Sequence, residues 1–338
     1  ALSQSELFRL KKDLGEKNKV TVKLRNNISD LDKQVSEKKL EIQNKENVIK
    51  AIAVWGNQLK PNIINSWLNP YILPSETPKK EVLIIMAGNI PLVGLHDFIS
   101  VIICGHKAAI KKSSADCILI DIIIDQLFKI DKRFKSYVEF VENVKDMSFD
   151  AVIATGSNNS AKYFDYYFKD SKRIIRRNRR SIAVLDGNES QDDLKGLSED
   201  IFSYFGLGCR NVSKLFLPNG YDLDKLFNVF FRFSDIINHR KYANNYEYNK
   251  AVFLIGGNKI VDNGFVMLKE EETLFSPVAM IYYEYYSSID KVNSFIDKNN
   301  DYIQCVVSSE KTPFGEAQNP NLWDYADGVD TISFLKSI

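Results

Sequence analysis

The sequence predicts an α/β fold in which helices cover parallel sheets. First, residues 81–88 form a short apolar run that ends in glycine, which is typical of a buried parallel strand. Second, strand-like and helix-like segments alternate after this run, as they do in a doubly wound parallel sheet. Third, the alternation restarts beyond Asp186. We therefore expect two α/β domains, spanning residues 1–185 and 186–338.

The first half of the chain begins with a helical pattern. Residues 1–60 are rich in lysine and lack sustained heptads, which predicts solvated helices rather than a long coiled coil. The strand at 81–88 opens the first expected sheet. The elements expected after it are helices at 91–105, 116–128 and 160–168 and strands at 107–113, 138–143 and 150–155.

The second half repeats this organisation. Its strands are rich in aromatic residues, which favour β-structure. The elements expected here are helices at 193–205 and 222–237 and strands at 213–218, 251–257, 265–270, 278–286 and 303–309.

Composition argues against several classes of function. The 338 residues carry a net charge of +1, so no global field favours nucleic acid or an anionic membrane. Four cysteines and three histidines are scattered, which argues against a disulfide framework and a metal site. No stretch reaches the roughly 20 apolar residues of a membrane span, and we find no secretory signal. We expect a cytoplasmic protein with reduced thiols, no metal and no membrane span.

Asn89 stands where the first expected strand ends and a helix begins. Pro91 follows it and suits the first turn of a helix, where its missing N–H would be unpaired in any case. Parallel sheets place their binding sites at the carboxyl ends of the strands. Asn89 is therefore either a helix cap or part of a functional site.

A second polar turn follows the strand at 150–155. Gly156 permits a tight turn, and Ser157 with the next backbone N–H groups could face a pyrophosphate. A plain helix start capped by serine has the same pattern. The standard glycine-rich fingerprints of nucleotide binding are absent.

Cys209 is the cysteine whose surroundings suit a nucleophile. Gly206 and Gly208 precede it, let a ligand approach the backbone closely, and leave the thiol accessible. Arg210 and a nearby helix end would favour the thiolate. The other three cysteines lie in apolar segments, where an inert, buried thiol is expected. These are Cys104, Cys117 and Cys305.

In order and spacing these segments resemble the aldehyde dehydrogenase superfamily. The resembling stretches are AGNIP (87–91), AAIKKSSAD (108–116), IATGSNNSA (153–161) and FGLGCRNVSKLFLP (205–218). Within that superfamily, residues 81–338 are similar to the LuxC-type acyl-CoA reductases (fatty-acyl reductases) known from bacterial bioluminescence. GNIPLVGLHDF, CGHKAAIKKSS, ATGSNNSAKYF and WDYADGVDT are specific stretches of this kind.

The resemblance implies a role for each segment. Asn89 would supply the oxyanion hole, and Cys209 would be the covalent nucleophile. Lys111 and Ser113 would approach the adenosine ribose or its 2′-phosphate. Gly156 and Ser157 would face the cofactor phosphates.

The resemblance also implies an aldehyde dehydrogenase-like architecture. Residues 1–185 would hold N-terminal helices and a Rossmann-like cofactor domain. Residues 186–338 would form the catalytic domain, whose C-terminal part could contribute to oligomerisation.

One departure from the superfamily pattern bears on the reaction. The ELGGK segment, which carries a general-base glutamate, is replaced by Arg-Arg-Asn-Arg-Arg at 176–180. Without a glutamate to activate water, hydrolysis of an acyl-enzyme would be slow, so acyl transfer to or from a thiol is favoured. The six cations between 172 and 180 are either a solvated strand edge or a clamp for CoA or cofactor phosphates.

The activity implied is reduction of a fatty acyl-CoA to the fatty aldehyde through an acyl-cysteine, with NADPH rather than NADH as cofactor. Expected partners are the fatty acyl-CoA, further copies in a homo-oligomer, and an acyl-protein ligase or thioesterase. Two alternatives stay open: a reductase of an acyl phosphate or short-chain acyl-CoA, and a non-catalytic acyl-binding or acyl-transfer subunit.

Overall fold

The computed structural model describes residues 45–73, 79–114, 116, 118–144 and 147–338. Most of the helical segment expected at 1–60 therefore lies outside the described residues. Its last part forms helix α2 (Lys45–Gln58), and helix α3 (Pro61–Leu68) follows with proline in its first turn.

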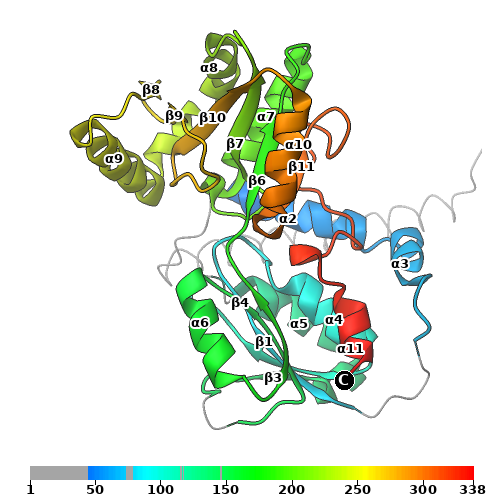
Figure 1. Cartoon of the computed structure of the whole chain (residues 1–338). Helices are drawn as coiled ribbons and strands as arrows, with labels where there is room; N and C mark the ends of the chain where they lie inside the picture. Colours follow the sequence, from blue (N-terminus) through cyan, green and yellow to red (C-terminus); the bar gives the residue numbers. More distant parts are fainter. Residues whose placement is uncertain (1–44, 74–78, 115, 117, 145–146) are drawn as a thin grey trace, which may run out of the picture. The chain divides into compact units, whose positions relative to one another are not determined.

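The first sheet has five parallel strands in the order β3-β2-β1-β4-β5 (Figure 1). Strand β1 lies at its centre, where Leu83 is in register with Ala109 on one side and Val152 on the other. The strands are β1 (Glu81–Ile85), β2 (Lys107–Lys111), β3 (Val138–Phe140), β4 (Ala151–Thr155) and β5 (Lys172–Arg176).

Helices cover both faces of this sheet, which explains why its central strands are apolar without alternation. Figure 1 shows α6 on one face and α4, α5 and α11 on the other. Ile84 packs with Phe98 on the second of these faces, whereas Leu83 packs with Phe168 on the first. The helices are α4 (Leu95–Ile103), α5 (Ile118–Ile130), α6 (Asn158–Tyr167) and α11 (Thr331–Lys336).

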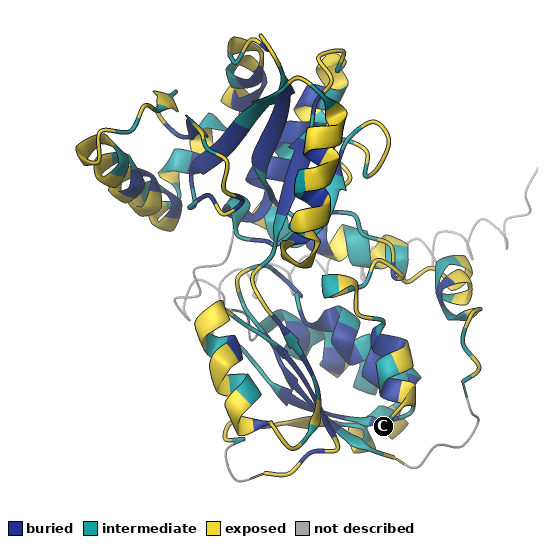
Figure 2. Ribbon diagram, in the orientation of Figure 1, coloured by how far each residue is buried: buried dark blue, intermediate teal, exposed yellow. Residues whose placement is uncertain are grey.

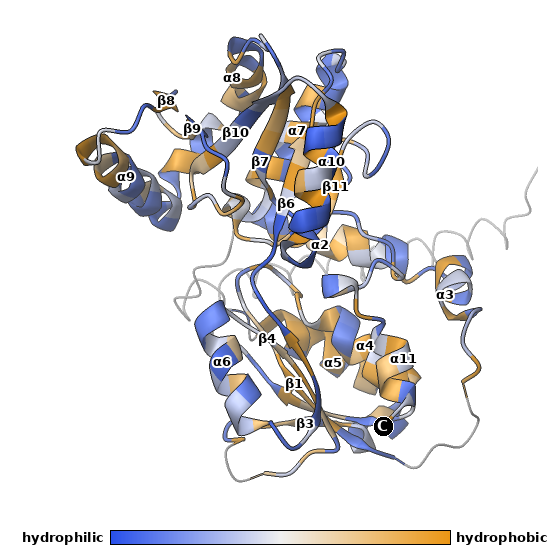
Figure 3. Cartoon of the chain, viewed as in Figure 1, coloured by the Kyte–Doolittle hydropathy of each residue, from blue (hydrophilic) through white to orange (hydrophobic). Residues whose placement is uncertain are grey.

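The second sheet has six strands in the order β11-β6-β7-β10-β9-β8, and only β8 runs antiparallel to its neighbour. Its inner strands are buried and strongly hydrophobic (Figures 2 and 3). The strands are β6 (Arg180–Val184), β7 (Val212–Pro218), β8 (Val261–Asp262), β9 (Met267–Glu270), β10 (Met280–Tyr286) and β11 (Ile303–Val307).

Two core clusters lie on opposite faces of this sheet. Leu215 packs with Leu197 in one cluster, and Phe216 packs with Val292 in the other. The helices of this half are α7 (Gln191–Phe202), α8 (Asp224–Phe230), α9 (Arg240–Ile255) and α10 (Ile289–Lys298). Short 3-10 helices are η1 (Lys132–Ser136), η2 (Ser203–Gly206), η3 (Phe231–Asn238), η4 (Asn300–Tyr302) and η5 (Ala326–Gly328).

The predicted α/β class is confirmed, but the prediction of a strand at 251–257 is wrong. This apolar run is the end of helix α9. The helix begins after His239, whose ring nitrogen caps it by accepting a hydrogen bond from the Tyr242 N–H. Val252, Leu254 and Ile255 are exposed, so their hydrophobicity does not come from burial in a sheet. Strands β5 and β6 and helix α10 are not among the expected elements.

The two sheets divide between β5 and β6, at residues 177–179. The chain returns to the first sheet near its end, because Ile332 and Leu335 of α11 belong to the core cluster that contains Phe98. The domain boundary expected at 185/186 stays a prediction. None of the described helices has the length and hydropathy needed to cross a membrane.

Candidate active site

The residues predicted to bind the cofactor follow neighbouring strands of the first sheet. Lys111 is the last residue of β2, Gly156 and Ser157 follow β4, and Asn89 comes after β1. Because β1 lies between β2 and β4 and all three are parallel, these residues share the carboxyl edge of the sheet.

Gly156 and Ser157 form a tight, capped start of helix α6. The Ser157 hydroxyl oxygen accepts a hydrogen bond from the Ser160 N–H at 3.2 Å. A Cβ on Gly156 would lie 2.9 Å from Ser160 Cβ and 3.1 Å from a ring carbon of Phe164, so glycine lets the helix start this close to β4. The N-terminus of this ten-residue helix can also hold a phosphate.

Lys111 and Lys112 are adjacent in sequence but bind different partners. The Lys111 ammonium donates to the backbone carbonyl of Glu142 at 2.6 Å. Lys112 instead forms an ion pair with Asp121 of α5 at 2.8 Å. Ser113 follows in the loop and is partly exposed.

Asn89 makes direct contact with the loop that carries Cys209. Its Nδ2 donates a hydrogen bond to the carbonyl oxygen of Leu207 at 2.8 Å. Ile90 also approaches this loop, with Cγ2 3.6 Å from the position of a Cβ on Gly208. The structure thus brings Asn89 to the loop that carries Cys209, and the catalytic roles of both residues stay predictions.

The loop before Cys209 has an unusual backbone. Tyr204, Phe205 and Gly206 are three consecutive residues with positive φ, at 54°, 57° and 69°. This conformation is rare for aromatic residues and persists only where neighbours enforce it. The loop connects α7 to β7 and leaves Cys209 partly exposed.

Asn211 is a buried residue that holds this loop in shape, a role that its sequence context does not reveal. Its Oδ1 accepts from the Gly208 N–H at 2.8 Å, while Nδ2 donates to the Ser203 carbonyl at 2.8 Å. Nδ2 also approaches the carbonyls of Asp200 and Ile201, at the end of α7. A Cβ on Gly208 would lie 2.9 Å from Asn211 Oδ1, so this contact requires glycine.

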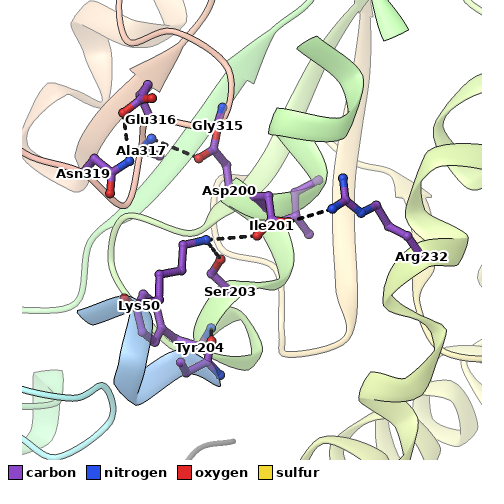
Figure 4. Close-up of polar contacts among 12 residues, drawn as sticks. Lys50, Asp200, Ile201, Ser203, Tyr204, Arg232, Gly315, Glu316, Ala317 and Asn319 are labelled. Carbon is purple, nitrogen blue, oxygen red and sulfur yellow. Dashed lines mark hydrogen bonds and ion pairs between the residues drawn. The ribbon is translucent and has the colours of Figure 1, made fainter. Parts of the chain in front are cut away.

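Helix α2 supports the same loop (Figure 4). The Lys50 ammonium donates to the Ser203 hydroxyl at 2.8 Å and pairs with Glu199 at 3.0 Å. Asn47 of the same helix accepts a hydrogen bond from the Tyr204 N–H at 3.2 Å. Polar contacts from α2 therefore help to enforce the strained backbone.

Asp200 of α7 is fully buried and holds a distant loop (Figure 4). Its carboxylate accepts hydrogen bonds from the N–H groups of Gly315 at 2.7 Å and Ala317 at 3.0 Å. Burial raises the pKa of this carboxyl to about 7, although the two hydrogen bonds act in the opposite direction.

Most of the arginines at 173–180 bind carboxylates of the chain itself. Arg176 forms a buried ion pair with Asp97 at 2.5 Å, and Arg179 pairs with Asp327 at 3.2 Å. Arg173 and Arg177 pair with Asp165 at 3.4 and 2.5 Å. Internal ion pairing is a third role for this cluster, beyond the solvated edge and the phosphate clamp expected from the sequence.

The described cysteines differ in burial. Cys104 is buried, whereas Cys209 and Cys305 are partly exposed. Cys117 lies outside the described residues. Within the part of the chain that the structure describes, no three His, Cys, Asp or Glu side chains are grouped to hold a metal ion.

A family model described as acyl-CoA reductase (LuxC) matches residues 14–226. The chain belongs to this LuxC family. The family predicted from the sequence motifs is thereby confirmed. The family's description also agrees with the expected enzyme class, an oxidoreductase that acts on acyl or aldehyde groups. No curated protein sequence matches the chain at a significant level.

Solved aldehyde dehydrogenases share the fold. Aldehyde dehydrogenase 21 from Physcomitrella patens is 13% identical, with a TM-score of 0.59 over 86% of this chain and 72% of that one. Aldehyde dehydrogenase C from Pseudomonas syringae is 11% identical, with a TM-score of 0.55 over 72% of this chain and 61% of that one. The aldehyde dehydrogenase-like fold is thus confirmed, and the chain spans about six tenths of the Pseudomonas syringae protein.

Proposed function

We propose that this LuxC-family member reduces a fatty acyl-CoA to the fatty aldehyde with NADPH, through a thioester on Cys209. The observation that carries the proposal is the 2.8 Å hydrogen bond from Asn89 Nδ2 to the Leu207 carbonyl. It places an amide donor from the first sheet beside the loop that bears the nucleophile. The family description supports the acyl-CoA substrate.

Acylation uses the groups of this loop. The Cys209 thiolate attacks the thioester carbonyl, a new C–S bond forms, and the bond to CoA breaks, so that CoA leaves as its thiol after taking up a proton. Asn89, whose Nδ2 lies beside this loop, would donate to the oxyanion together with the Cys209 backbone N–H.

The first sheet fits a dinucleotide cofactor. The N-terminus of α6 with Ser157 suits the pyrophosphate, and Lys111 with Ser113 at the end of β2 suits a ribose 2′-phosphate, which favours NADPH. When bound, the cofactor supplies the hydride that reduces the Cys209 thioester. Cys209 then leaves as the thiolate and the aldehyde is released. The Pseudomonas syringae neighbour was solved with NAD+ and octanal, a nicotinamide cofactor paired with an aliphatic aldehyde.

The proposal also covers where the protein acts, how it assembles and which enzymes it works with. We expect the protein to act in the cytoplasm as a homo-oligomer, and an acyl-protein ligase or thioesterase to supply or receive the acyl group. NADH, an acyl phosphate or a short-chain acyl-CoA would be used less efficiently.

The test is aldehyde formation from myristoyl-CoA and NADPH, followed by mass spectrometry of the captured aldehyde. Wild type and the control Cys104→Ala, which removes a buried thiol, should both form aldehyde. Cys209→Ser should lose at least a thousandfold in rate, because an alcohol is a far poorer nucleophile than a thiolate. Equal rates for wild type and Cys209→Ser would refute the proposal. Faster turnover of acetyl-CoA or an acyl phosphate than of myristoyl-CoA would show that fatty acyl-CoA is not the preferred substrate.

A further inference from the structure

A small cavity of about 30 Å³ lies within the second half of the chain. Its walls come from the first residues of β6 and β7, the end of α7, the start of α9 and the segment that leads into β10. Neither Asn89 nor Cys209 is among the residues that line it. The cavity is therefore a feature that the proposed reaction does not use.

Arg180, the first residue of β6, brings a positive charge to this cavity. No carboxylate among the described residues pairs with it, and its Nε is buried without a hydrogen-bond partner there. An arginine keeps its charge in proteins, and leaving a buried charged donor unpaired is costly. The other arginines of the run each pair with an aspartate: Arg173, Arg176, Arg177 and Arg179.

Ser213 brings a hydroxyl to the same cavity because of an irregularity in the sheet. Strands β6 and β7 pair Ser181 with Val212, and their next pair is Ile182 with Lys214. Ser213 is thus an additional residue of β7 at this point, as in a β-bulge, which re-aims a side chain. Its Oγ is buried and, within the described part of the chain, has no hydrogen-bond partner.

The remaining polar groups of the cavity are also uncharged donors. Tyr242 lines it, and burial raises the pKa of this phenol, so that the hydroxyl keeps its proton. The Ser276 hydroxyl donates to the Ser213 carbonyl at 3.0 Å and fixes this wall. No aspartate or glutamate is among the described residues that line the cavity. One cation and several hydroxyl groups without a carboxylate fit an anion and repel a cation.

The size and the lining of the cavity favour a carboxylate among the anions. A buried water needs roughly 10–15 Å³, so about 30 Å³ holds a group of about two or three heavy atoms. A guanidinium binds a carboxylate through two parallel hydrogen bonds, and their charges match. A phosphate group carries close to two negative charges, which a single arginine does not balance. Apolar residues of the wall suit an aliphatic group next to the carboxylate, among them Ile201, Val266 and Met280.

We propose that this cavity binds the head group of an aliphatic carboxylate, with Arg180 as its counter-ion and Ser213 as a second donor. Binding is noncovalent and changes no bond of either partner. A fatty acid and a short-chain acid share this chemistry. The site goes beyond the proposed function, because it takes a free acid rather than a thioester and does not involve Cys209.

The test is isothermal titration calorimetry of the full chain without acyl-CoA or cofactor. Butyrate and octanoate are the probes, and 1-butanol and butylamine are controls that keep the chain but lack the negative charge. Wild type should bind one carboxylate per chain and neither control. Arg180→Met should weaken binding at least tenfold, and Ser213→Ala about threefold. Arg177→Gln, which changes an exposed arginine of the same run, should leave the affinity unchanged.

Thermal unfolding gives a second comparison. Without ligand, Arg180→Met should be at least as stable as wild type, because it removes an unpaired buried charge. With saturating butyrate only wild type should gain in Tm, since a ligand stabilises the state that binds it. Loss of folding in Arg180→Met would reveal a structural partner of the arginine and overturn the proposal.

The binding data decide the remaining points. Absence of carboxylate binding would overturn the proposal, as would equal affinity of wild type and Arg180→Met or tighter binding of inorganic phosphate. An unchanged affinity in Ser213→Ala would overturn the role of that hydroxyl. Tighter binding of octanoate than of butyrate would identify the ligand as a fatty acid, and the reverse order would identify a short-chain acid.

Discussion

Asn89 Nδ2 lies 2.8 Å from the carbonyl oxygen of Leu207, although 118 residues separate them in the sequence. The hydrogen bond joins the turn after β1 to the loop that precedes β7. It links a residue of the first sheet to the neighbourhood of Cys209.

Removing this amide should slow the acyl chemistry without unfolding the protein. We expect Asn89→Ala to lower kcat on the order of 10²–10³-fold, the usual cost of an oxyanion donor. Asn228→Ala, an exposed position on α8, serves as the control and should keep wild-type kinetics. Steady-state reduction of myristoyl-CoA measures both, and a kcat for Asn89→Ala within threefold of wild type would remove Asn89 from the mechanism.

Lys111 should contribute to cofactor affinity rather than to chemistry. Lys111→Ala should raise the KM for NADPH about tenfold while kcat at saturating cofactor changes little, because a 2′-phosphate would lose one cationic partner. Lys112→Ala is the matched control, since its ammonium pairs with Asp121 instead. A larger rise in KM for Lys112→Ala than for Lys111→Ala would contradict this assignment.

The buried Arg176–Asp97 pair should matter far more for stability than the exposed Arg177–Asp165 pair. The side chains of Arg176 and Asp97 are 6% and 5% exposed, so Arg176→Met leaves an uncompensated buried carboxylate and should lower the free energy of unfolding by about 3–5 kcal/mol. Arg177→Met, where the arginine is 56% exposed, should cost less than about 1 kcal/mol. Urea unfolding of the two variants gives the comparison, and equal losses would refute it.

Asp200 should make stability depend on pH in a defined direction. Its pKa rises from 3.8 to about 7 on folding, so the native state binds more protons than the unfolded chain between these values. The contribution is fully present below about pH 4 and is lost as pH rises through about 7. Between pH 5 and 8, wild type should lose roughly 2–3 kcal/mol relative to Asp200→Asn.

Urea titrations at the two pH values measure this difference. Asp192→Asn changes an exposed residue of the same helix, so its free energy of unfolding should depend on pH as that of wild type does. A pH dependence of Asp200→Asn that matches wild type would show that Asp200 does not titrate in this range.

The sequence predicted the fold class and the position of the candidate site because both depend on local patterns. The run at 81–88 is apolar without alternation, as a strand covered on both faces must be, and it forms β1. The polar turn at Gly156 and Ser157 follows β4 as expected.

The features that the sequence did not predict depend on contacts between residues that are distant in sequence. Arg176 pairs with Asp97, 79 residues away in the sequence. No local pattern distinguishes an arginine in such a pair from a solvated one. The residues at 251–257 have the composition of a strand, but Ile255 is 88% exposed at the end of α9. Asn211 is identified as a support of the Cys209 loop only when its three carbonyl partners are seen around it.

The most direct test of the central claim is the mass of the protein after incubation with myristoyl-CoA in the absence of NADPH. The account predicts an increase equal to one myristoyl group, located on the peptide that contains Cys209 and removed as aldehyde when NADPH is added. The buried-thiol control Cys104→Ala should behave the same way, and Cys209→Ser should gain no mass. An acyl group on another residue, or aldehyde formation by Cys209→Ser at the wild-type rate, would contradict the account.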